Sequence, residues 1–463
     1  MPKQRFRRFD HQLYCEAVQE AFKNGKWYRN DVLSFIEKYA GIPRAEIRIT
    51  YLTGDAGPKI EAVESIALYL EDVVDGILRG EEPEDMVPVK VRQRRDGMTG
   101  KVRDIALLCI LHQLLGHVAK LALDPLLHAR ITHTQHASIP ERGQTSLKKQ
   151  VHKYLRKESL GIRYAEKTDV THAYATTMYA VLTDLIRKEI PKAKDLLRLL
   201  EYLGKIAPGG HLIIGGYIDA WLFNFAMSYA IRFTGTVGQT RRGRFTPFVI
   251  RCVAFMDDFL LLGRSAKGLK RATKALDKWM RENLHLSIRV STGIIRILPV
   301  REEKARRSLE EKAKRGCPVV DMAGFKICRT HIMIRRRVFI RARREFIRAA
   351  KELRDTGTLR RSRAFAAISY YSFVAQTDSV LFARKYHVEE LVQAAAKIVG
   401  FYTRLKDRQR KEILYALQKR RAAYGAGEGT SGEAPRVHTG EAPGQCQAGG
   451  EGRFGGNCPD LPF

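Results

Sequence analysis

The chain has 463 residues, of which 82 are Lys or Arg and 50 are Asp or Glu, so its formal net charge is +32. A charge this large indicates a polyanionic partner, either a nucleic acid or an acidic membrane surface. Hydrophobic residues make up 44% of the chain, which allows a large core and excludes a wholly disordered protein. The longest apolar stretch, residues 105–118, contains polar side chains and is too short to span a membrane.

The chain begins Met-Pro-Lys-Gln-Arg-Phe-Arg-Arg, without the apolar segment of a secretion signal. The cysteines are Cys15, Cys109, Cys252, Cys317, Cys328, Cys446 and Cys458. They form no Cys-x-x-Cys pair, so we expect reduced thiols, a cytoplasmic protein and no zinc site. Residues 1–88 are expected to form a mainly helical N-terminal extension.

The first candidate site residue in chain order is Asp169, which ends a predicted strand over residues 163–169. A predicted helix follows at 175–187. Carboxylates from separate strand ends can converge on two metal ions roughly 4 Å apart, which is what metal-assisted phosphoryl transfer needs. Magnesium suits this chemistry because it takes oxygen ligands and binds substrate phosphates. The competing interpretation is a helix N-cap, since N-caps favour Asp.

Two adjacent aspartates, Asp257 and Asp258, interrupt an otherwise apolar segment. The pattern predicts a β-hairpin with these carboxylates at its tip, between strands at 247–255 and 259–264. Neighbouring carboxylates repel each other and are costly to desolvate, so a bound divalent metal would explain the pair. The alternative is a solvated turn between two strands.

Residues 265–283 predict an amphipathic helix. Its two faces carry Leu269, Leu276 and Met280 on the apolar side and Lys267, Lys274 and Lys278 on the basic side. Strands are expected at 286–290 and 293–300. Residues 302–315 are highly charged and predict a solvated helix or an inserted loop.

A basic segment at 335–346 places Phe339 and Phe346 between arginines. Such a helix would follow the backbone of a nucleic-acid duplex, and the alternative is that its aromatic rings enter the core; we expect both in part. From residue 425 the chain is rich in Gly, Glu, Ala and Pro, so we expect 424–463 to be a disordered, low-complexity tail.

Several segments resemble, in chain order, the motifs of reverse transcriptases. Residues 169–174, Asp-Val-Thr-His-Ala-Tyr, resemble motif A, and residues 255–258, Phe-Met-Asp-Asp, resemble motif C, usually Tyr-x-Asp-Asp. Further segments resemble the remaining motifs: 100–105 and 137–144 the bacterial fingers motifs, 212–224 motif B, 284–289 motif D and 321–326 the primer-grip motif E. The resemblance extends over about residues 90–390 and is greatest to bacterial or prophage-type enzymes related to those of group II introns, retrons and diversity-generating retroelements.

The resemblance implies an α+β right-hand polymerase fold with fingers, an antiparallel-sheet palm and a helical thumb. We expect the fingers at 89–160 and the palm, with motifs A to D, at 161–300. Motif E, the thumb and C-terminal helices would occupy 301–423. The implied activity is an RNA-directed DNA polymerase that adds dNTPs to a primer 3′-hydroxyl with two Mg²⁺ ions.

The resemblance also implies individual roles. Asp169 and Asp257 would be metal ligands, Asp258 a supporting carboxylate, and the backbone carbonyl of Val170 would complete a metal shell. Tyr174 would pack under the sugar and exclude a ribose 2′-hydroxyl; the alternative is an ordinary core aromatic. The other nucleotide-binding residues would be Lys101, Arg103, Arg142, Gly215 and Arg289. Template or primer would contact Asn224, Gly324, Arg335, Arg336 and Arg337. For Lys101, Arg103 and Arg142, solvated basic surface is the alternative.

Motif B departs from the family pattern, because Ile218-Asp219-Ala220-Trp221 stands where many bacterial members have Ser or Gln after the Gly. Asp219 would be a further acidic group near the site, and His172 is an unusual residue within motif A. Template-independent or protein-primed DNA synthesis therefore stays open. So does a non-catalytic nucleic-acid-binding ribonucleoprotein subunit, while Tyr174 argues against an RNA polymerase.

The expected partners are an RNA template, a DNA or RNA primer, dNTPs and a cognate non-coding RNA, with no membrane. The sequence identifies no protein partner. A bacterial retroelement and an antiphage defence system are the two settings that the resemblance favours.

Overall fold

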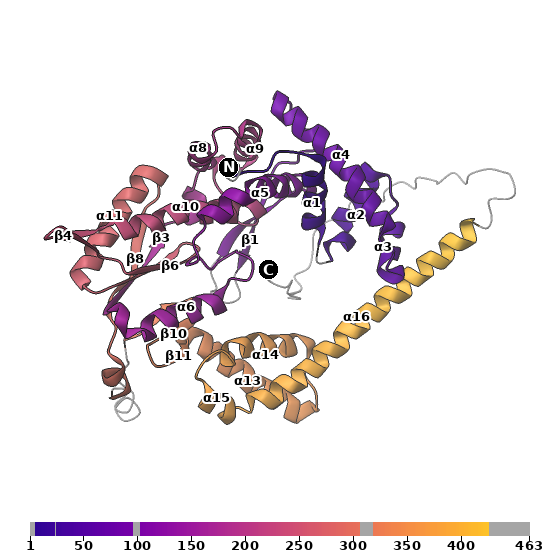
Figure 1. Cartoon of the computed structure of the whole chain (residues 1–463). Helices are drawn as coiled ribbons and strands as arrows, with labels where there is room; N and C mark the ends of the chain where they lie inside the picture. Colours follow the sequence, from indigo (N-terminus) through magenta and orange to yellow (C-terminus); the bar gives the residue numbers. More distant parts are fainter. Residues whose placement is uncertain (1–4, 24, 96–101, 306–317, 426–463) are drawn as a thin grey trace, which may run out of the picture. The chain divides into compact units, whose positions relative to one another are not determined.

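The computed structural model describes residues 5–23, 25–95, 102–305 and 318–425 (Figure 1). Within these ranges the chain forms many helices and four small sheets whose strands pair antiparallel. The predicted α+β class is therefore confirmed. No helix in the described ranges has the length and apolar character that crossing a membrane would require.

The helices are α1 (His11–Phe22), α2 (Asn30–Ala40), α3 (Arg44–Thr53), α4 (Gly57–Arg79), α5 (Ile110–Arg130), α6 (Gln144–Arg156), α7 (Ala173–Thr176), α8 (Tyr179–Glu189), α9 (Lys194–Ile206), α10 (Tyr217–Thr236), α11 (Ala266–Leu284), α13 (Arg336–Thr356), α14 (Arg361–Val374), α15 (Val380–Lys385) and α16 (Val388–Gly425). The strands are β1 (Lys90–Arg95), β2 (Val102–Leu107), β3 (Tyr164–Val170), β4 (Gly238–Arg241), β5 (Arg244–Pro247), β6 (Arg251–Phe255), β7 (Asp258–Gly263), β8 (Ile288–Arg296), β9 (Val320–Met322), β10 (Phe325–Ile327) and β11 (Ile332–Ile334). Internal contacts divide the chain into two units, Met1–Leu417 and Gln418–Phe463, and all elements from α1 to α15 belong to the first.

The N-terminal region is helical from α1 to α4, as the sequence predicted. The first helix begins after Asp10, whose side chain accepts a hydrogen bond from Leu13 N at 2.7 Å and so caps an otherwise unpaired N–H. Apolar residues of α4 recur at helical spacing, and Ile66, Leu70 and Val74 are fully buried. These helices pack through α1 and α4 against α5 and α9 and join the main hydrophobic core.

The central sheet has four antiparallel strands in the order β6-β7-β3-β8. Its strand β7 is buried on both faces, which explains the unbroken run Phe-Leu-Leu-Leu in this segment. Phe259 and Leu261 face the core beneath α10 and α11, whereas Leu260 and Leu262 face a second core formed with α6 and the β9–β11 sheet. The sheet is therefore covered on both sides, and its inner strand β3 also carries the buried polar residues Glu166 and Thr168.

The outer edge of β6 is covered by the segment that precedes α6. Ala254 N donates to Thr134 O at 2.9 Å, and His136 N donates to Ala254 O at 3.1 Å. Gln135 thereby forms a parallel bridge with Ala254. The edge strand consequently has part of its backbone hydrogen bonding satisfied from outside the sheet.

Two predicted elements can be compared directly with the structure. The predicted helix at 265–283 is α11, with Leu269, Leu276 and Met280 buried and the three lysines of the opposite face exposed. The two predicted strands at 286–290 and 293–300 are instead one strand, β8. Ser-Thr-Gly at 291–293 is compatible with a turn, but β3 offers a continuous partner, and register shifts along that pairing absorb the irregularity.

The helices after β11 surround a third core. Phe346 of α13 is fully buried, and Phe339 is partly buried with its ring centroid 4.9 Å from that of Phe382, so the aromatic residues of the basic segment enter the core. The charged segment 302–315 begins in a helix at 300–305, and its residues from 306 onward lie outside the described ranges. Of the expected tail, residues 424 and 425 continue α16, and 426–463 lie outside the described ranges.

Candidate active site

Strand pairing brings Asp169 and the Asp257-Asp258 pair to one end of the central sheet. Asp169 lies opposite Asp258 in the β3–β7 register, and the backbone N–H of Val170 donates to the carbonyl of Asp257 at 3.0 Å. Asp169 is thus part of a strand. The N-cap interpretation is wrong, because the residue that precedes α7 is His172, at a left-handed φ of 50°.

The turn between β6 and β7 holds its backbone under strain. Phe255 pairs with Asp258, so Met256 and Asp257 form a two-residue turn. Met256 adopts a φ of 55°, a left-handed conformation that residues other than glycine seldom adopt. This conformation costs about 1–3 kcal/mol of folding free energy. The neighbouring strands fix this turn and so present the Asp257 carboxylate at the end of the sheet.

Two of the three carboxyl groups, those of Asp257 and Asp258, have raised pKa values. Burial raises the pKa of Asp257 to about 6, and repulsion from Asp258 and Asp169 adds to the effect. Burial also raises the pKa of Asp258, although the ammonium group of Lys167 opposes that change. Perturbed carboxylates at a strand end are typical of functional sites, because folding alone gains nothing from crowding them.

Two cations lie against this acidic group. Lys167 Nζ is 2.8 Å from Asp258 Oδ2, and both side chains are largely buried. Arg289 of β8 lies opposite Asp169 and donates from Nε and Nη2 to Asp169 Oδ2 at 2.8 and 2.7 Å. The Arg289 side chain is 66% exposed, so this ion pair is weak and easily exchanged for other partners.

The oxygen atoms of Asp169, Asp257 and Asp258 are chemically suited to bind magnesium. The carboxylate oxygens are the hard ligands that Mg²⁺ prefers, and an added cation would relieve the repulsion that raises the pKa of Asp257. Asp169 and Asp258 are paired with separate cations, Arg289 and Lys167, whereas the Asp257 carboxyl group lies close to that of Asp169. Among the described residues, two other trios bring potential metal-ligand atoms within 4.8 Å of one another: His11, Cys15 and Glu64, and Glu303, Cys328 and His331.

Tyr174 of α7 lies beside the acidic group. Its ring is stacked on Phe223 of α10, with centroids 5.5 Å apart and an angle of 18° between the planes. Burial raises its pKa well above the ordinary value, and its hydroxyl is close enough to Asp257 and Arg103 to interact with their charges. The structure therefore brings Tyr174 and Arg103, which were expected to bind the nucleotide, close to Asp257, which was expected to bind metal.

Gly215 joins β2 to the loop before α10. Ala106 N of β2 donates to Ile214 O at 2.8 Å, and a Cβ at Gly215 would lie only 2.9 Å from the carbonyl oxygen of Ala106. Its φ of +117° is also one that side-chain-bearing residues avoid. Glycine is thus required here, and this contact fixes the strand that carries Arg103.

Asp219 is turned into the protein rather than toward the strand end. Its Oδ1 accepts hydrogen bonds from Ile213 N at 2.8 Å and from the Tyr179 hydroxyl at 3.2 Å, whereas Oδ2 is buried without a partner in the structure. Burial raises the pKa of Asp219 to about 6. Asp219 lies near enough to Tyr174 for its charge to raise the pKa of that residue, so it is an acidic group near the site, as expected. Its side chain is only 1% exposed and holds the loop before α10.

Asn224 and Arg142 also make internal contacts. Asn224 is 1% exposed, and its Nδ2 donates to the carbonyls of Ala137 and Ala220, each at 3.0 Å. It therefore positions α10 instead of touching a template. Arg142 Nη1 donates to Thr132 O at 2.7 Å, which gives it a role in the loop before α6, and nucleotide binding by Arg142 stays a prediction.

The turn between β9 and β10 carries the predicted primer-grip glycine. Gly324, at φ +89°, packs so closely on Phe373 that a Cβ would come within 2.9 Å of its ring, and its carbonyl accepts from Arg335 N at 2.9 Å. Arg335 pairs with Asp321 and lies close enough to Asp258 to lower its pKa. Arg336 and Arg337 follow at the exposed start of α13. Lys101 lies outside the described residues.

No model of a known protein family matches the chain, and no curated protein sequence matches it. The functional interpretation therefore rests on the residues themselves.

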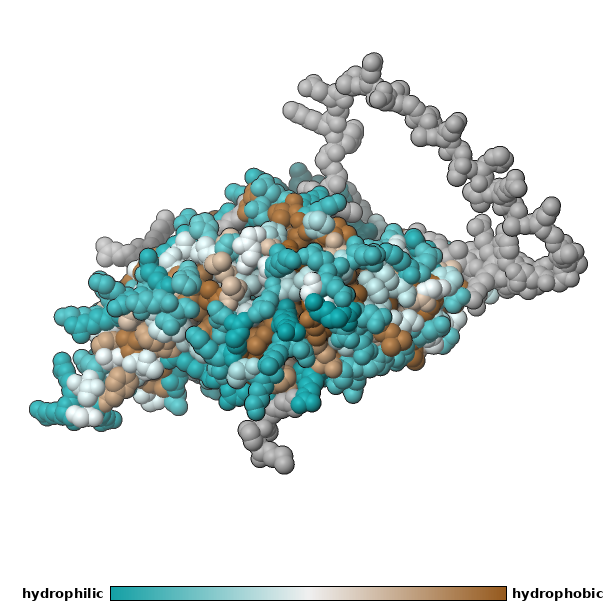
Figure 2. All heavy atoms as spheres, turned by 90° about the horizontal axis from the view of Figure 1, so that it is seen from above, coloured by the Kyte–Doolittle hydropathy of each residue, from teal (hydrophilic) through white to brown (hydrophobic). Residues whose placement is uncertain are grey.

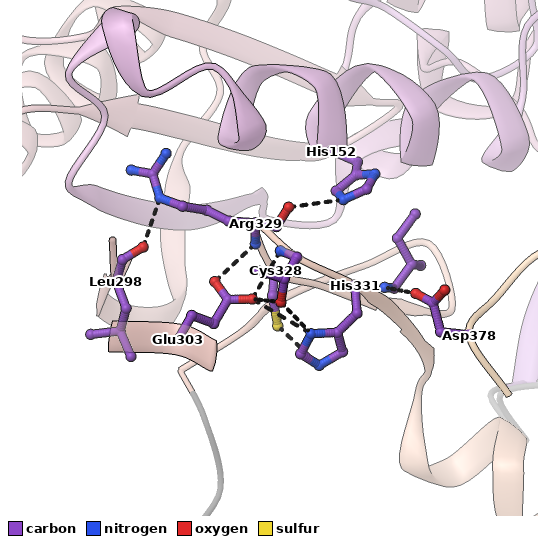
Figure 3. Close-up of polar contacts among 9 residues, drawn as sticks. His152, Leu298, Glu303, Cys328, Arg329, His331 and Asp378 are labelled. Atoms are coloured by element: carbon purple, nitrogen blue, oxygen red, sulfur yellow. Dashed lines mark hydrogen bonds and ion pairs between the residues drawn. The ribbon is translucent and has the colours of Figure 1, made fainter. Parts of the chain in front are cut away.

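A buried polar cluster holds the turn between β10 and β11 (Figure 3). The carboxylate of Glu303 accepts from the backbone N–H groups of Arg329 at 3.1 Å and Thr330 at 2.9 Å. Although burial raises the pKa of Glu303, hydrogen bonds from His331, Thr330 and Arg329 lower it to about 2. The Arg329 guanidinium in turn donates to Leu298 O at 2.7 Å. The cluster thus joins the 298–305 segment to the turn.

The Glu303, Cys328 and His331 trio belongs to this cluster and has its own hydrogen bonds. Cys328 Sγ is 3.7 Å from His331 Nε2, and the Thr330 hydroxyl is 2.9 Å from His331 Nδ1. Because these atoms already satisfy one another, we assign the trio a structural role. Sequence reasoning missed both this cluster and Lys167, since neither belongs to a recognisable spacing pattern.

Proposed function

We propose that this chain is an RNA-directed DNA polymerase of the reverse-transcriptase type. The observation that supports it most is the pairing of β3 with β7, which brings Asp169 against Asp257 and Asp258 although they are far apart in the sequence. Carboxylates arranged at adjacent strand ends are what two-metal phosphoryl transfer requires. The motif order along the chain agrees with this interpretation.

Under this proposal the elements correspond to a right hand. The β1–β2 hairpin would belong to the fingers, the β6-β7-β3-β8 sheet would be the palm, and α13 to α16 would include the thumb. The α13 face is rich in exposed arginines, which suits contact with the phosphates of a primer–template duplex. A formal net charge of +32 is consistent with the same partner.

Asp169 and Asp257 would hold two Mg²⁺ ions, with Asp258 and the Val170 carbonyl in support. When bound, the ions would lower the pKa of the attacking hydroxyl and neutralise the leaving phosphate. Lys167 favours the ionised form of Asp258 and holds its carboxyl group in place, because its ammonium group opposes the effect of burial on that carboxyl. These carboxylates would form a negatively charged site that binds the metal ions, and the phosphates of the substrate would bind to those ions.

Arg103 and Arg289 would bind the triphosphate. Arg289 is exposed and holds Asp169 only weakly, so it can turn toward a phosphate when a cation takes its place. Tyr174, supported from behind by Phe223, would contact the sugar and leave no room for a 2′-hydroxyl. The site would thus select deoxynucleotides over ribonucleotides.

Catalysis is tested with Asp257→Asn on a primed RNA template with dNTPs and Mg²⁺. We expect extension to fall by about 10³-fold or more, since a metal ligand contributes several kcal/mol to phosphoryl transfer. The matched control is Asp184→Asn, which makes the same change on an exposed position of α8 and should retain full activity. Equal primer extension by the wild type and by Asp257→Asn would refute the proposed polymerase activity. Wild-type extension that is the same with and without the RNA template would favour template-independent synthesis.

Sugar selection is tested with Tyr174→Ala. Removal of the ring should lower the preference for dNTP over rNTP by about 10- to 100-fold, because the space beside the sugar opens. Tyr174→Phe keeps the ring and should keep the preference. An unchanged ratio in the alanine variant would remove Tyr174 as the selecting residue.

A further inference from the structure

The β4–β5 hairpin projects from the body of the protein at the edge where Figure 1 places β4. Its strands pair from Gly238–Pro247 to Arg241–Arg244, and the two turn residues, Arg242 and Gly243, have φ values of 49° and 72°. Two left-handed residues in a two-residue loop match the right-handed twist of the strands and give a tight, well-defined tip. In Figure 2 the projection at the same edge of the molecule ends mostly in hydrophilic residues.

The tip carries an unbalanced positive charge. Arg241, Arg242 and Arg244 are exposed, and none of their side chains has an ion pair or hydrogen bond to another described residue. Residues 238–251 contain no Asp or Glu. Three unpaired guanidinium groups on a small projection repel one another, so they favour a partner rich in phosphate.

The hairpin also presents an aromatic surface. Phe245 is 48% exposed, and its Cε2 and Cζ atoms lie over Gly238, where a Cβ would be only 2.7 Å from each. The missing side chain at Gly238 lets part of the ring rest on the backbone while the remainder faces solvent. A supported, exposed ring beside arginines is a suitable platform for an unpaired base.

The hairpin is remote from the candidate active site. Phe248, at its base, donates from its N–H to Val237 O at 2.9 Å and packs against Gly268 of α11. Its carbonyl also approaches Gly263, at the end of β7 opposite Asp258. The length of β7 separates these ends by roughly 17 Å. The exposed Lys267 and Arg271 of α11 add positive charge near the base.

We infer that the β4–β5 hairpin is a binding site for structured RNA, separate from the catalytic strand ends. The arginines contact phosphates of a stem, and Phe245 stacks on a base of an adjoining loop. RNA is favoured over duplex DNA because unpaired loop bases are available for stacking, whereas paired bases are not. The inference goes beyond the proposed polymerase activity and does not depend on it.

The test uses the full chain and fluorescence anisotropy with three labelled probes: an RNA stem–loop, the fully paired RNA duplex, and a DNA stem–loop of the same sequence. Combined Arg241→Ala, Arg242→Ala and Arg244→Ala substitutions should weaken RNA stem–loop binding and reduce the slope of log affinity against log salt by about 2. The control replaces Lys188, Lys192 and Lys194, three exposed cations on and between α8 and α9, by alanine. It removes the same charge and should change the slope little.

Phe245→Ala should weaken RNA stem–loop binding by about 5- to 100-fold, and Phe245→Trp should restore it, because stacking needs only an aromatic face. The duplex should be much less sensitive to Phe245→Ala than the stem–loop is. Stem–loop binding by the arginine variant equal to that of the lysine control would overturn the inference, as would a DNA stem–loop bound more tightly than the RNA. Extension of a short primer–template is measured on the same variants and should be unchanged; a wild-type protein that binds the RNA but extends nothing would refute the polymerase alone.

Discussion

Replacing Gly215 by alanine tests whether the contact between β2 and the loop before α10 organises the proposed nucleotide site. The new methyl group would lie 2.9 Å from the carbonyl oxygen of Ala106, a backbone atom that cannot move alone. Strand β2 would have to shift, and the 2.8 Å hydrogen bond from Ala106 N to Ile214 O would be lengthened or lost. Arg103, three residues earlier on the same strand, would move with it.

The size of the effect follows from two contributions. A side chain at φ +117° costs about 1–3 kcal/mol, and the lost hydrogen bond costs about 1 kcal/mol. We therefore expect Gly215→Ala to lower the free energy of unfolding by about 2–4 kcal/mol. Gly41→Ala is the matched control, because Gly41 has a φ of +67° with no atom within 4 Å of the added Cβ. It should cost only about 1–2 kcal/mol.

The measurements are denaturant unfolding of both variants and the KM for dNTP on a primed RNA template. Gly215→Ala should raise the dNTP KM, since Arg103 no longer lies beside Tyr174, whereas Gly41→Ala should leave it unchanged. The reasoning would be refuted if both variants lost the same stability and the KM of Gly215→Ala stayed at the wild-type value.

Two further predictions concern buried carboxylates. Between pH 4 and pH 8, the stability of Asp219→Asn relative to wild type should rise by about 2.5 kcal/mol. Burial raises the folded pKa of Asp219 from 3.8 to about 6, so the wild-type protein loses stability as pH rises through that window. Unfolding at the two pH values checks this, and a pH-independent difference would contradict it. Glu303→Gln should destabilise the protein by about 3 kcal/mol at pH 7, since the folded pKa of about 2 lies below 4.5 and the stabilisation is present above that value. The difference from wild type should shrink as pH falls from 4.5 toward 2; a constant difference over that range would show that the charge is not responsible.

The parts of the fold that depend on local pattern could be predicted from the sequence. The α11 face was predictable because its apolar residues recur at helical spacing, and the hairpin at Asp257 because an apolar run is broken at one point. Asp169 could be linked to Asp257 only through the order of motifs. The convergence of these carboxylates depends on strand pairing, which local spacing does not specify.

The supporting contacts were not predictable for the same reason. Lys167 meets Asp258 only through the β3–β7 register, and Gly215 meets Ala106 across a large separation in the sequence. The inward direction of Asp219 depends on the Tyr179 hydroxyl of another helix. Each of these contacts joins segments whose relative position is fixed only when the whole core forms.

The segment that bonds to the outer edge of β6 determines where the chain can be truncated. Thr134 and His136 bond the outer edge of that strand, yet they precede the predicted palm boundary at residue 161. A fragment limited to 161–300 would lose this cover and present bare N–H and C=O groups along β6, to which another copy could add a strand. Such a fragment would therefore self-associate, so a shortened form of this chain that keeps the central sheet has to begin before Thr134.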